Sequence, residues 1–259
     1  MQDTSALGRA LAMVRDLRVR CPWDRAQTRE TLRPYLVEEM LEVDHAIAGG
    51  DPARIRDELG DFLLHLAWQL VLGEERGEFS ADDVADSMER KMRRRHPHLF
   101  ELGPPEPWER LKQRERAGIL GSVPPGLPDL LAAYRLQERA ASVGFDWPDA
   151  EGPSTKVREE LAEVEREIDT HGPGQHGVAS DALTEEIGDL LFAVVNLARK
   201  AGVQPGPALD RANRKFQARF AALEQLATSR GIEVGTAGLA ALDELWDEVK
   251  RQPAGSAEA

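Results

Sequence analysis

The chain lacks several features that whole classes of proteins require. Its 259 residues include one cysteine, Cys21, so a single chain can build neither a disulfide framework nor a thiolate zinc site. No apolar run reaches the roughly 18 residues that a membrane span needs. The first residues, MQDTSALGRALAMV, lack the basic and apolar regions of a secretory signal. We therefore expect a cytoplasmic protein that does not enter a membrane.

Positive charge is outweighed by negative charge in this sequence. There are 33 lysines and arginines against 46 acidic residues, which gives a formal net charge of −13. Such a chain repels DNA, RNA and anionic membranes, so we expect no nucleic-acid polymer and no membrane as partner. If the ligand is an anion, metal cations should mediate its binding.

Helical periodicity is the dominant pattern that is present. Leu59, Phe62, Leu63 and Leu66 recur at helical spacing, and the same pattern returns over residues 187–198. Gly49-Gly50 predicts a helix end, Asp51-Pro52 the start of the next helix, and Thr155 a cap of a later one. No stretch alternates convincingly as a strand does. The sequence predicts an all-α fold of about ten helices.

The length and the turn residues predict two helical domains. A chain of this size fits one large domain or two smaller ones, and the segment GSVPPGLPD at 121–129, rich in proline and glycine, favours two. We predict an N-terminal domain at 1–120, a linker at 121–129, a C-terminal domain at 130–252 and a disordered tail at 253–259.

The two halves repeat each other at an offset of about 121 to 128 residues. The aligned pairs keep the same order in both halves: CPWD (21–24) with FDWP (145–148), YLVEEMLEV (35–43) with KVREELAEV (156–164), RDELGDFLLHL (56–66) with TEEIGDLLFAV (184–194), and KMRRRHPHLF (91–100) with KFQARFAALE (215–224). A duplicated order turns single coincidences into a pattern.

Each half therefore carries Glu-x-x-Glu on one helix and Glu-x-x-Asp on the next. Residues three apart project from one helical face, so two such helices packed antiparallel bring four carboxylates together. Two carboxylates about 5 Å apart repel by roughly 3 kcal/mol, and magnesium or manganese relieves this repulsion. Flanking apolar residues such as Leu41 and Leu191 should be buried. The predicted metal ligands are Glu39, Glu42, Glu58, Asp61, Glu160, Glu163, Glu186 and Asp189.

A glycine lies inside the second acidic motif of each half, at Gly60 and Gly188. Glycine in a helix interior is about 1 kcal/mol less favourable than alanine. The two glycines indicate close approach of another group, and either a neighbouring helix or a metal or ligand fits that description equally well.

The paired motifs carry a family resemblance. Together with CPWD, PYLVEEMLEV, DELGDFLLHL, RRHPHLF, GFDW, EEIGDLLFAVVNLARKAG and KFQARF, they resemble MazG-type nucleoside triphosphate pyrophosphohydrolases of the tandem-domain form, over residues 5–251. The resemblance implies helical units that pair into four-helix-bundle-like dimers. It also implies magnesium-dependent cleavage of a nucleoside triphosphate between the α- and β-phosphates, which releases the monophosphate and pyrophosphate.

The chemistry of the carboxylates agrees with that activity. Divalent ions neutralise phosphate oxygens and lower the pKa of a bound water that attacks phosphorus. Glu38 and Glu159, adjacent to the predicted ligands, are the candidate bases. Mn²⁺ is an expected substitute for Mg²⁺.

Other side chains are candidates for binding the substrate. Cationic side chains should complete the site. In each half, two basic residues spaced four apart follow the acidic motifs. The set is Lys156, Lys215 and Arg219 with Asn196 and Trp246 in the second half, and Lys91 and Arg95 in the first. The surroundings of these residues in the second half resemble the catalytic domain of the family more closely than those in the first half, so we predict the second half to be the main catalytic unit.

Two alternatives compete with this interpretation. The acidic helices of an interaction scaffold would be solvated faces with no metal affinity. A redox di-metal bundle is suggested by Glu42-x-x-His45, but such bundles need that motif twice, and Arg166 stands at the matching position. We also expect a homodimer, because helix pairs this short bury their apolar stripes best against another copy; partial pairing of the two halves with each other is the alternative.

Overall fold

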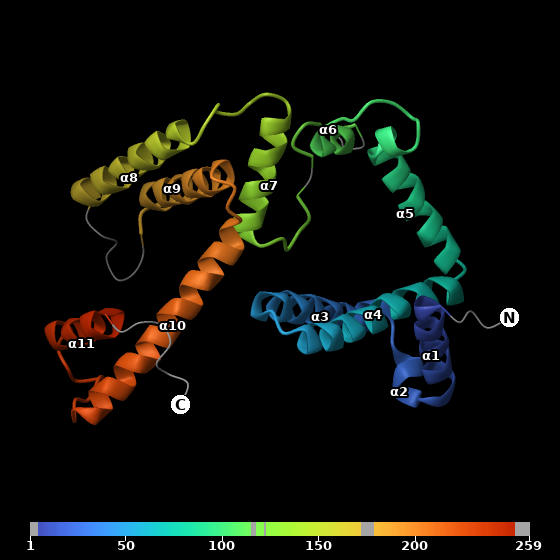
Figure 1. Cartoon of the computed structure of the whole chain (residues 1–259), viewed down its shortest axis with the longest axis horizontal. Coiled ribbons are helices and arrows are strands. Elements are labelled where there is room, and N and C mark those ends of the chain that lie inside the picture. The colour runs from blue at the N-terminus through green and yellow to red at the C-terminus, as the bar shows by residue number, and fades with distance from the viewer. Residues whose placement is uncertain (1–4, 115–117, 122, 172–178, 252–259) are drawn as a thin grey trace. The chain divides into compact units, whose positions relative to one another are not determined.

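The computed structural model describes residues 5–114, 118–121, 123–171 and 179–251 (Figure 1). The first compact unit, 1–106, holds α1 (Ala6–Arg20), α2 (Pro22–Ala26), α3 (Arg29–Gly49), α4 (Pro52–Glu75), α5 (Ala81–Arg95) and the 3₁₀ turn η1 (Pro97–Leu99). The second, 107–259, holds α6 (Trp108–Gln113), α7 (Asp129–Ser142), α8 (Glu151–His171), α9 (Asp181–Lys200), α10 (Pro205–Ser229) and α11 (Leu239–Arg251).

The all-α prediction is confirmed, because the described ranges contain helices and no strand. None of the helices within those ranges has an apolar stretch of the length that a bilayer requires. The division between the units falls between Glu106 and Pro107, because α6 packs against α7 and Arg110 donates to the carbonyl of Ser142. The predicted linker at 121–129 stays a prediction, and the predicted tail at 253–259 lies outside the described residues.

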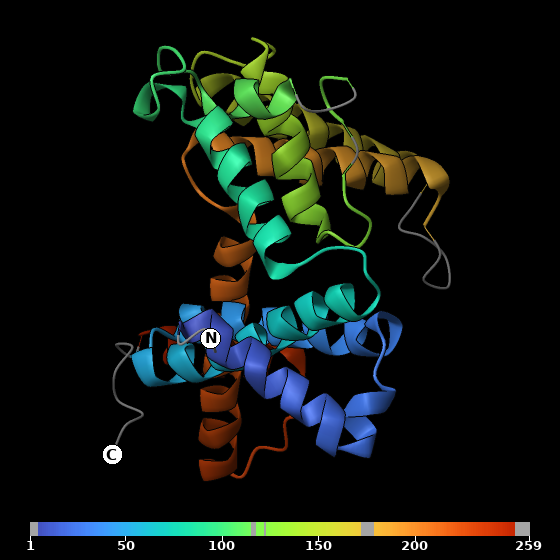
Figure 2. The same ribbon diagram turned by 90° about the vertical axis from the view of Figure 1, so that its right-hand side faces the viewer.

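A tight turn joins α3 to α4. Gly50 ends α3 in the left-handed conformation (φ 75°), which suits glycine because it has no Cβ. Asp51 then caps α4 by accepting from the backbone N–H of Ala53, and Pro52 occupies the first turn. Both predicted helix boundaries are confirmed here, and the two helices lie side by side in both views (Figures 1 and 2).

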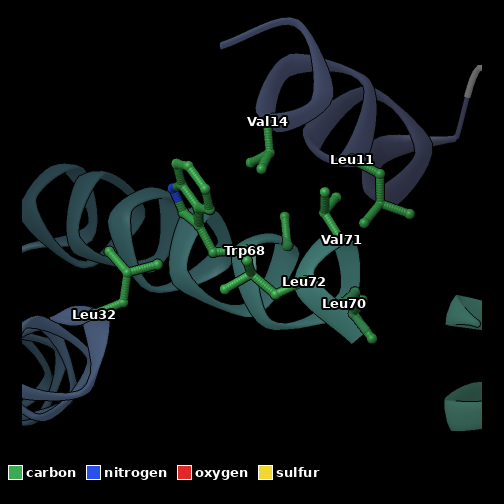
Figure 3. Close-up of a cluster of buried hydrophobic side chains, with 8 residues drawn as sticks. Leu11, Val14, Leu32, Trp68, Leu70, Val71 and Leu72 are labelled. Carbon is green, nitrogen blue, oxygen red and sulfur yellow. The ribbon is translucent and has the colours of Figure 1, made fainter. Parts of the chain in front are cut away.

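The core of the first unit is built on the second half of α4. Trp68 and Val71 of α4 face Val14 of α1, and Leu32 of α3 closes the other side (Figure 3). The guanidinium of Arg18 lies 5.4 Å from the Trp68 ring and covers this core from solvent. The second half of α4 is thus held in this core, and the first half, which carries the acidic motif, extends away from the core.

The second unit is organised around the helix pair α8 and α9. These helices lie side by side (Figures 1 and 2), and α7 packs against α9. The predicted cap at Thr155 is wrong, since α8 already begins at Glu151. Pro153 is tolerated in the first turn because its missing N–H has no partner inside the helix. Gly152 leaves room for the Trp147 ring, which lies where a Cβ would stand.

The apolar residues beside the acidic motifs are not buried in a single chain, contrary to expectation. Leu41 is 55% exposed and Leu191 is 54% exposed, and Ile187, Phe192 and Val194 resemble them. A layer of two helices has two faces, and the described contacts within each unit cover only one of them. Each acidic helix pair thus presents an apolar face to its surroundings.

Candidate metal centres

Carboxylates from facing helices meet at one place in each unit. In the first unit Glu39 and Glu42 of α3 meet Glu58 of α4, with one oxygen of each within 4.8 Å of the others. In the second unit Glu160 and Glu163 of α8 meet Glu186 of α9 in the same way. Spacing of three along one helix aligns the first two, and the packing of the next helix supplies the third. We call these groups the first and second triads.

The other two predicted ligands, Asp61 and Asp189, are exposed and do not belong to the triads. The charges of Asp61 and Asp189 nevertheless affect the pKa values of glutamates in the triads. Loss of water contact, followed by the charge of Asp61, raises the pKa of Glu39 above its ordinary 4.5. Loss of water contact, then the charges of Glu163, Glu160 and Asp189, raise the pKa of Glu186. Both centres therefore concentrate negative charge that a cation would relieve.

The donors present fit a divalent cation. The Oε2 atom of Glu39 is buried and has no hydrogen-bond partner. In the second triad Glu160 is only 4% exposed, and its Oε1 lies 2.5 Å from Nζ of Lys156, with which it forms an ion pair. Lys156 also reaches Glu159 at 2.9 Å, and these two carboxylates, Glu160 first, raise the pKa of Lys156. Clustered hard oxygens are the ligands that Mg²⁺ and Mn²⁺ prefer.

The two candidate bases lie beside the triads on exposed helix surface. Glu159 is held by Lys156, and Glu38 is the neighbour of Glu39 on α3. Both remain predictions as catalytic groups.

The predicted phosphate-binding pairs lie on helices that do not pack on the first acidic helix of either unit. Lys215 and Arg219 are on α10, which contacts α7, α9 and α11 but has no described contact with α8. Lys91 and Arg95 are on α5, whose contacts in the described chain are with α4 and η1 and not with α3. Their part in binding stays a prediction.

Asn196 and Trp246 have structural partners. The Asn196 side chain is buried, and its Oδ1 accepts from Arg199, which in turn binds Asp146 at 2.5 Å. Trp246 packs on the apolar cluster between α10 and α11, with its ring 5.4 Å from that of Phe216. Their substrate contacts also stay predictions.

One residue near the first triad was missed from the sequence. His65 is 7% exposed, and its Nε2 lies 3.8 Å from Oε1 of Glu39. A signal was available, because His65 stands seven residues after Glu58 and so on nearly the same helical face. His45, on which the redox alternative depends, is exposed and belongs to neither triad.

Comparisons with known proteins agree with this geometry. The family model of the MazG nucleotide pyrophosphohydrolase domain matches residues 27–100 and 154–222, so each match contains one triad. The chain is 39% identical over 264 residues to the nucleoside triphosphate pyrophosphohydrolase of Escherichia coli, covering 97% of this chain and 98% of that one. It is also 39% identical over 237 residues to the nucleoside triphosphate pyrophosphohydrolase/pyrophosphatase MazG of Thermotoga maritima, covering 89% of both chains.

Proposed function

The chain belongs to the MazG nucleotide pyrophosphohydrolase family, and we propose that it uses magnesium to split nucleoside triphosphates into the monophosphate and pyrophosphate. The resemblance predicted from the motifs is confirmed by the family match and by relatives that align over nearly the whole chain. The protein is accordingly an enzyme, a nucleoside triphosphate pyrophosphohydrolase of the hydrolase class.

The observation that carries the proposal is the second triad. Glu160, Glu163 and Glu186 would hold the cation, and Asp189 lies close enough to act on Glu186 electrostatically. Bound Mg²⁺ supplies charge neutralisation for phosphate oxygens and a more acidic water. The buried position of Glu160 fixes one oxygen donor rigidly, which favours a defined coordination geometry.

Lys156 and Glu159 have complementary tasks in this proposal. The Lys156 ammonium neutralises Glu160 in the metal-free chain, and it becomes available to a phosphate oxygen when a cation takes over that carboxylate. Glu159, released from the same lysine, is then an exposed carboxylate able to accept a proton from water. Both residues thus exchange their contact with each other for contacts with the reactants.

A homodimer completes the proposed site. The exposed apolar faces of α3–α4 and α8–α9 require a partner layer, and a second copy offers an identical one. Pairing of two such layers makes a four-helix arrangement. It also offers a route by which Lys215, Arg219 and Trp246 approach a triad that α10 does not reach by contact with α8.

The proposed substrates are ribo- and deoxyribonucleoside triphosphates, non-standard ones included, in the cytoplasm. Breadth is expected because the residues assigned to the reaction act on metal and phosphate, which all nucleotides share. The second half is proposed as the main catalytic unit, since Lys156 is present there and Tyr35 occupies the matching position in the first half. Mn²⁺ is proposed as a substitute metal.

Phosphorus NMR of the products tests the proposal. With Mg²⁺ and a mixture of nucleoside triphosphates, we expect monophosphate and pyrophosphate signals, and none after chelation by EDTA. Diphosphate and inorganic phosphate as products, or turnover that survives chelation, would contradict it. Complete absence of turnover with Mg²⁺ would favour the interaction scaffold.

A further inference from the structure

A lysine stands beside the second triad and is missing from the first. Lys156 precedes Glu160 by four residues on α8, and its Nζ is 2.5 Å from that carboxylate. In the repeat alignment Tyr35 takes the place of Lys156, and it precedes Glu39 by the same four residues on α3. Tyrosine carries no charge at neutral pH, so the first triad lacks the cation that the second one has.

The other charged neighbours of the two triads are alike. One arginine lies at the edge of each triad: Arg54 is 3.5 Å from Glu58, and Arg166 is 3.6 Å from Glu163. Both arginine side chains are more than half exposed, so water weakens both ion pairs to a similar extent. These arginines therefore do not distinguish the two centres.

His65 does not replace the missing lysine. Its Nε2 is 3.8 Å from Oε1 of Glu39, which exceeds a hydrogen bond. Burial lowers the pKa of His65 from its ordinary 6.5, so the ring is neutral at pH 7. Among the described residues, no lysine or arginine forms an ion pair with Glu39 or Glu42. Lys156 is therefore the charge that separates the two centres.

A lysine and a metal ion compete for the same carboxylate. A lysine this close repels a divalent ion, and the carboxylate must leave the lysine before it binds the ion. In the second triad a nucleoside triphosphate compensates for this loss, because its phosphates accept the displaced ammonium. The first triad has no such obstacle, and its three carboxylates, with oxygens within 4.8 Å of one another, can bind one divalent ion together.

We infer that the first triad binds a divalent cation without nucleotide, whereas the second triad takes up its cation together with the nucleoside triphosphate. The inference rests on the proposed binding of divalent metal by both triads. A cation held by Glu39 and Glu42 of α3 and by Glu58 of α4 joins these two helices, so it stabilises the first unit before substrate arrives. Tyr35 and Lys156 set the difference between the centres.

A Mn²⁺ titration followed by electron paramagnetic resonance tests the inference, because bound Mn²⁺ loses the sharp signal of the free ion. The full chain is titrated without nucleotide and then with a non-hydrolysable triphosphate analogue, each against a protein-free blank. Without nucleotide, the Glu42→Gln, Glu58→Gln variant should bind Mn²⁺ at least about tenfold more weakly, and the Glu163→Gln, Glu186→Gln variant within about threefold of the unsubstituted chain. The analogue should add binding that only the second variant loses.

Tyr35→Lys and Val37→Lys are a matched pair, because both positions lie on α3 and are similarly exposed, at 45% and 48%. A lysine at position 35 has the spacing to Glu39 that Lys156 has to Glu160, whereas position 37 lies on another face of the helix. Tyr35→Lys should weaken nucleotide-free Mn²⁺ binding at least about tenfold, and Val37→Lys less than about threefold.

Nucleotide-free binding that survives Glu42→Gln, Glu58→Gln, or that responds equally to Tyr35→Lys and Val37→Lys, overturns the inference. Binding by the unsubstituted chain with the analogue and none without it overturns the inference alone. No binding under either condition overturns the proposed function as well. The unsubstituted chain decides the last two outcomes, so they do not depend on the folding of any variant.

Discussion

The Lys156 ammonium lies 2.5 Å from a carboxylate oxygen of Glu160, the most deeply buried member of the second triad. The lysine ammonium thus already contacts a carboxylate that would bind a divalent cation. A positive charge so close both neutralises the triad in the free protein and opposes metal binding. In the proposed function, this pair couples metal binding to phosphate binding at Lys156.

Replacing Lys156 with methionine separates these two effects. We expect Lys156→Met to bind Mg²⁺ about tenfold more tightly without nucleotide, because the repulsion is removed. Its kcat/KM should fall about ten- to a hundredfold, because a charged contact to phosphate is lost. Calorimetry and pyrophosphate release measure the two quantities. Lys250→Met, which removes a similar ion pair with Asp247 on α11, should change neither; weaker Mg²⁺ binding by Lys156→Met would refute the coupling.

The pH dependence of stability should depend on Asp146. Hydrogen bonds from Arg199 first, and then Lys200, hold the pKa of Asp146 below its ordinary 3.8. Because the folded pKa is depressed, this stabilisation is present above pH 3.8 and is lost as pH falls through the folded pKa. Asp146→Asn should lower the free energy of unfolding by about 1–3 kcal/mol at pH 7.

Denaturant titrations of both proteins across the acid range measure this difference, which should shrink below pH 3.8. A difference that stays constant down to the lowest pH at which the protein folds would show that the ion pairs contribute nothing.

Two glycines on neighbouring helices should respond oppositely to alanine. A Cβ on Gly152 would lie 2.0 Å from the Trp147 ring, so Gly152→Ala should lower stability by about 1–3 kcal/mol. A Cβ on Gly188 meets no described atom within 4 Å, so Gly188→Ala should raise stability by about 1 kcal/mol. Thermal unfolding of the unsubstituted chain and both variants at one protein concentration measures both changes. Equal effects of the two changes would contradict this packing.

A charge on the apolar face of α9 should separate the proposed dimer. Leu191→Glu would bury a carboxylate against the second copy, and we expect the dissociation constant to rise at least about tenfold. Light scattering over a dilution series measures it. Leu239→Glu, at a leucine that is 84% exposed at the start of α11, is the control. A mass equal to one chain for the unsubstituted protein would remove the premise.

The sequence predicted which residues share a helical face far better than it predicted how the helices pack on one another. Spacing of three on a helix requires Glu39 and Glu42 to share a face, and the helix end at Gly50 lets α4 turn back along α3, so the first triad could be foreseen. The internal repeat extended that expectation to Glu160, Glu163 and Glu186. The sequence could not show that Asp61 and Asp189 lie outside the triads. Which side chains of the second helix face the first depends on helix rotation and crossing angle, and periodicity does not fix these.

Burial was predicted less well for a physical reason. Periodicity shows that Leu41 and Leu191 lie on apolar faces, but it does not say whether the covering layer belongs to the same chain. In the same way, the pair Lys215 and Arg219 is visible in the sequence, while the direction of α10 depends on its contacts with α7 and α9. The close approach expected at Gly60 and Gly188 is likewise not made by the described atoms of their own units, which leave open space at both.

Calorimetric titration of Mg²⁺ with a non-hydrolysable triphosphate analogue tests the central claim most directly. The claim is that the second triad binds divalent metal together with nucleotide. The unsubstituted chain should give a saturable heat of binding, and the Glu163→Gln, Glu186→Gln variant should lose the component that belongs to the second triad while remaining folded. Heats that are identical in both proteins, or no heat in either, would contradict that claim.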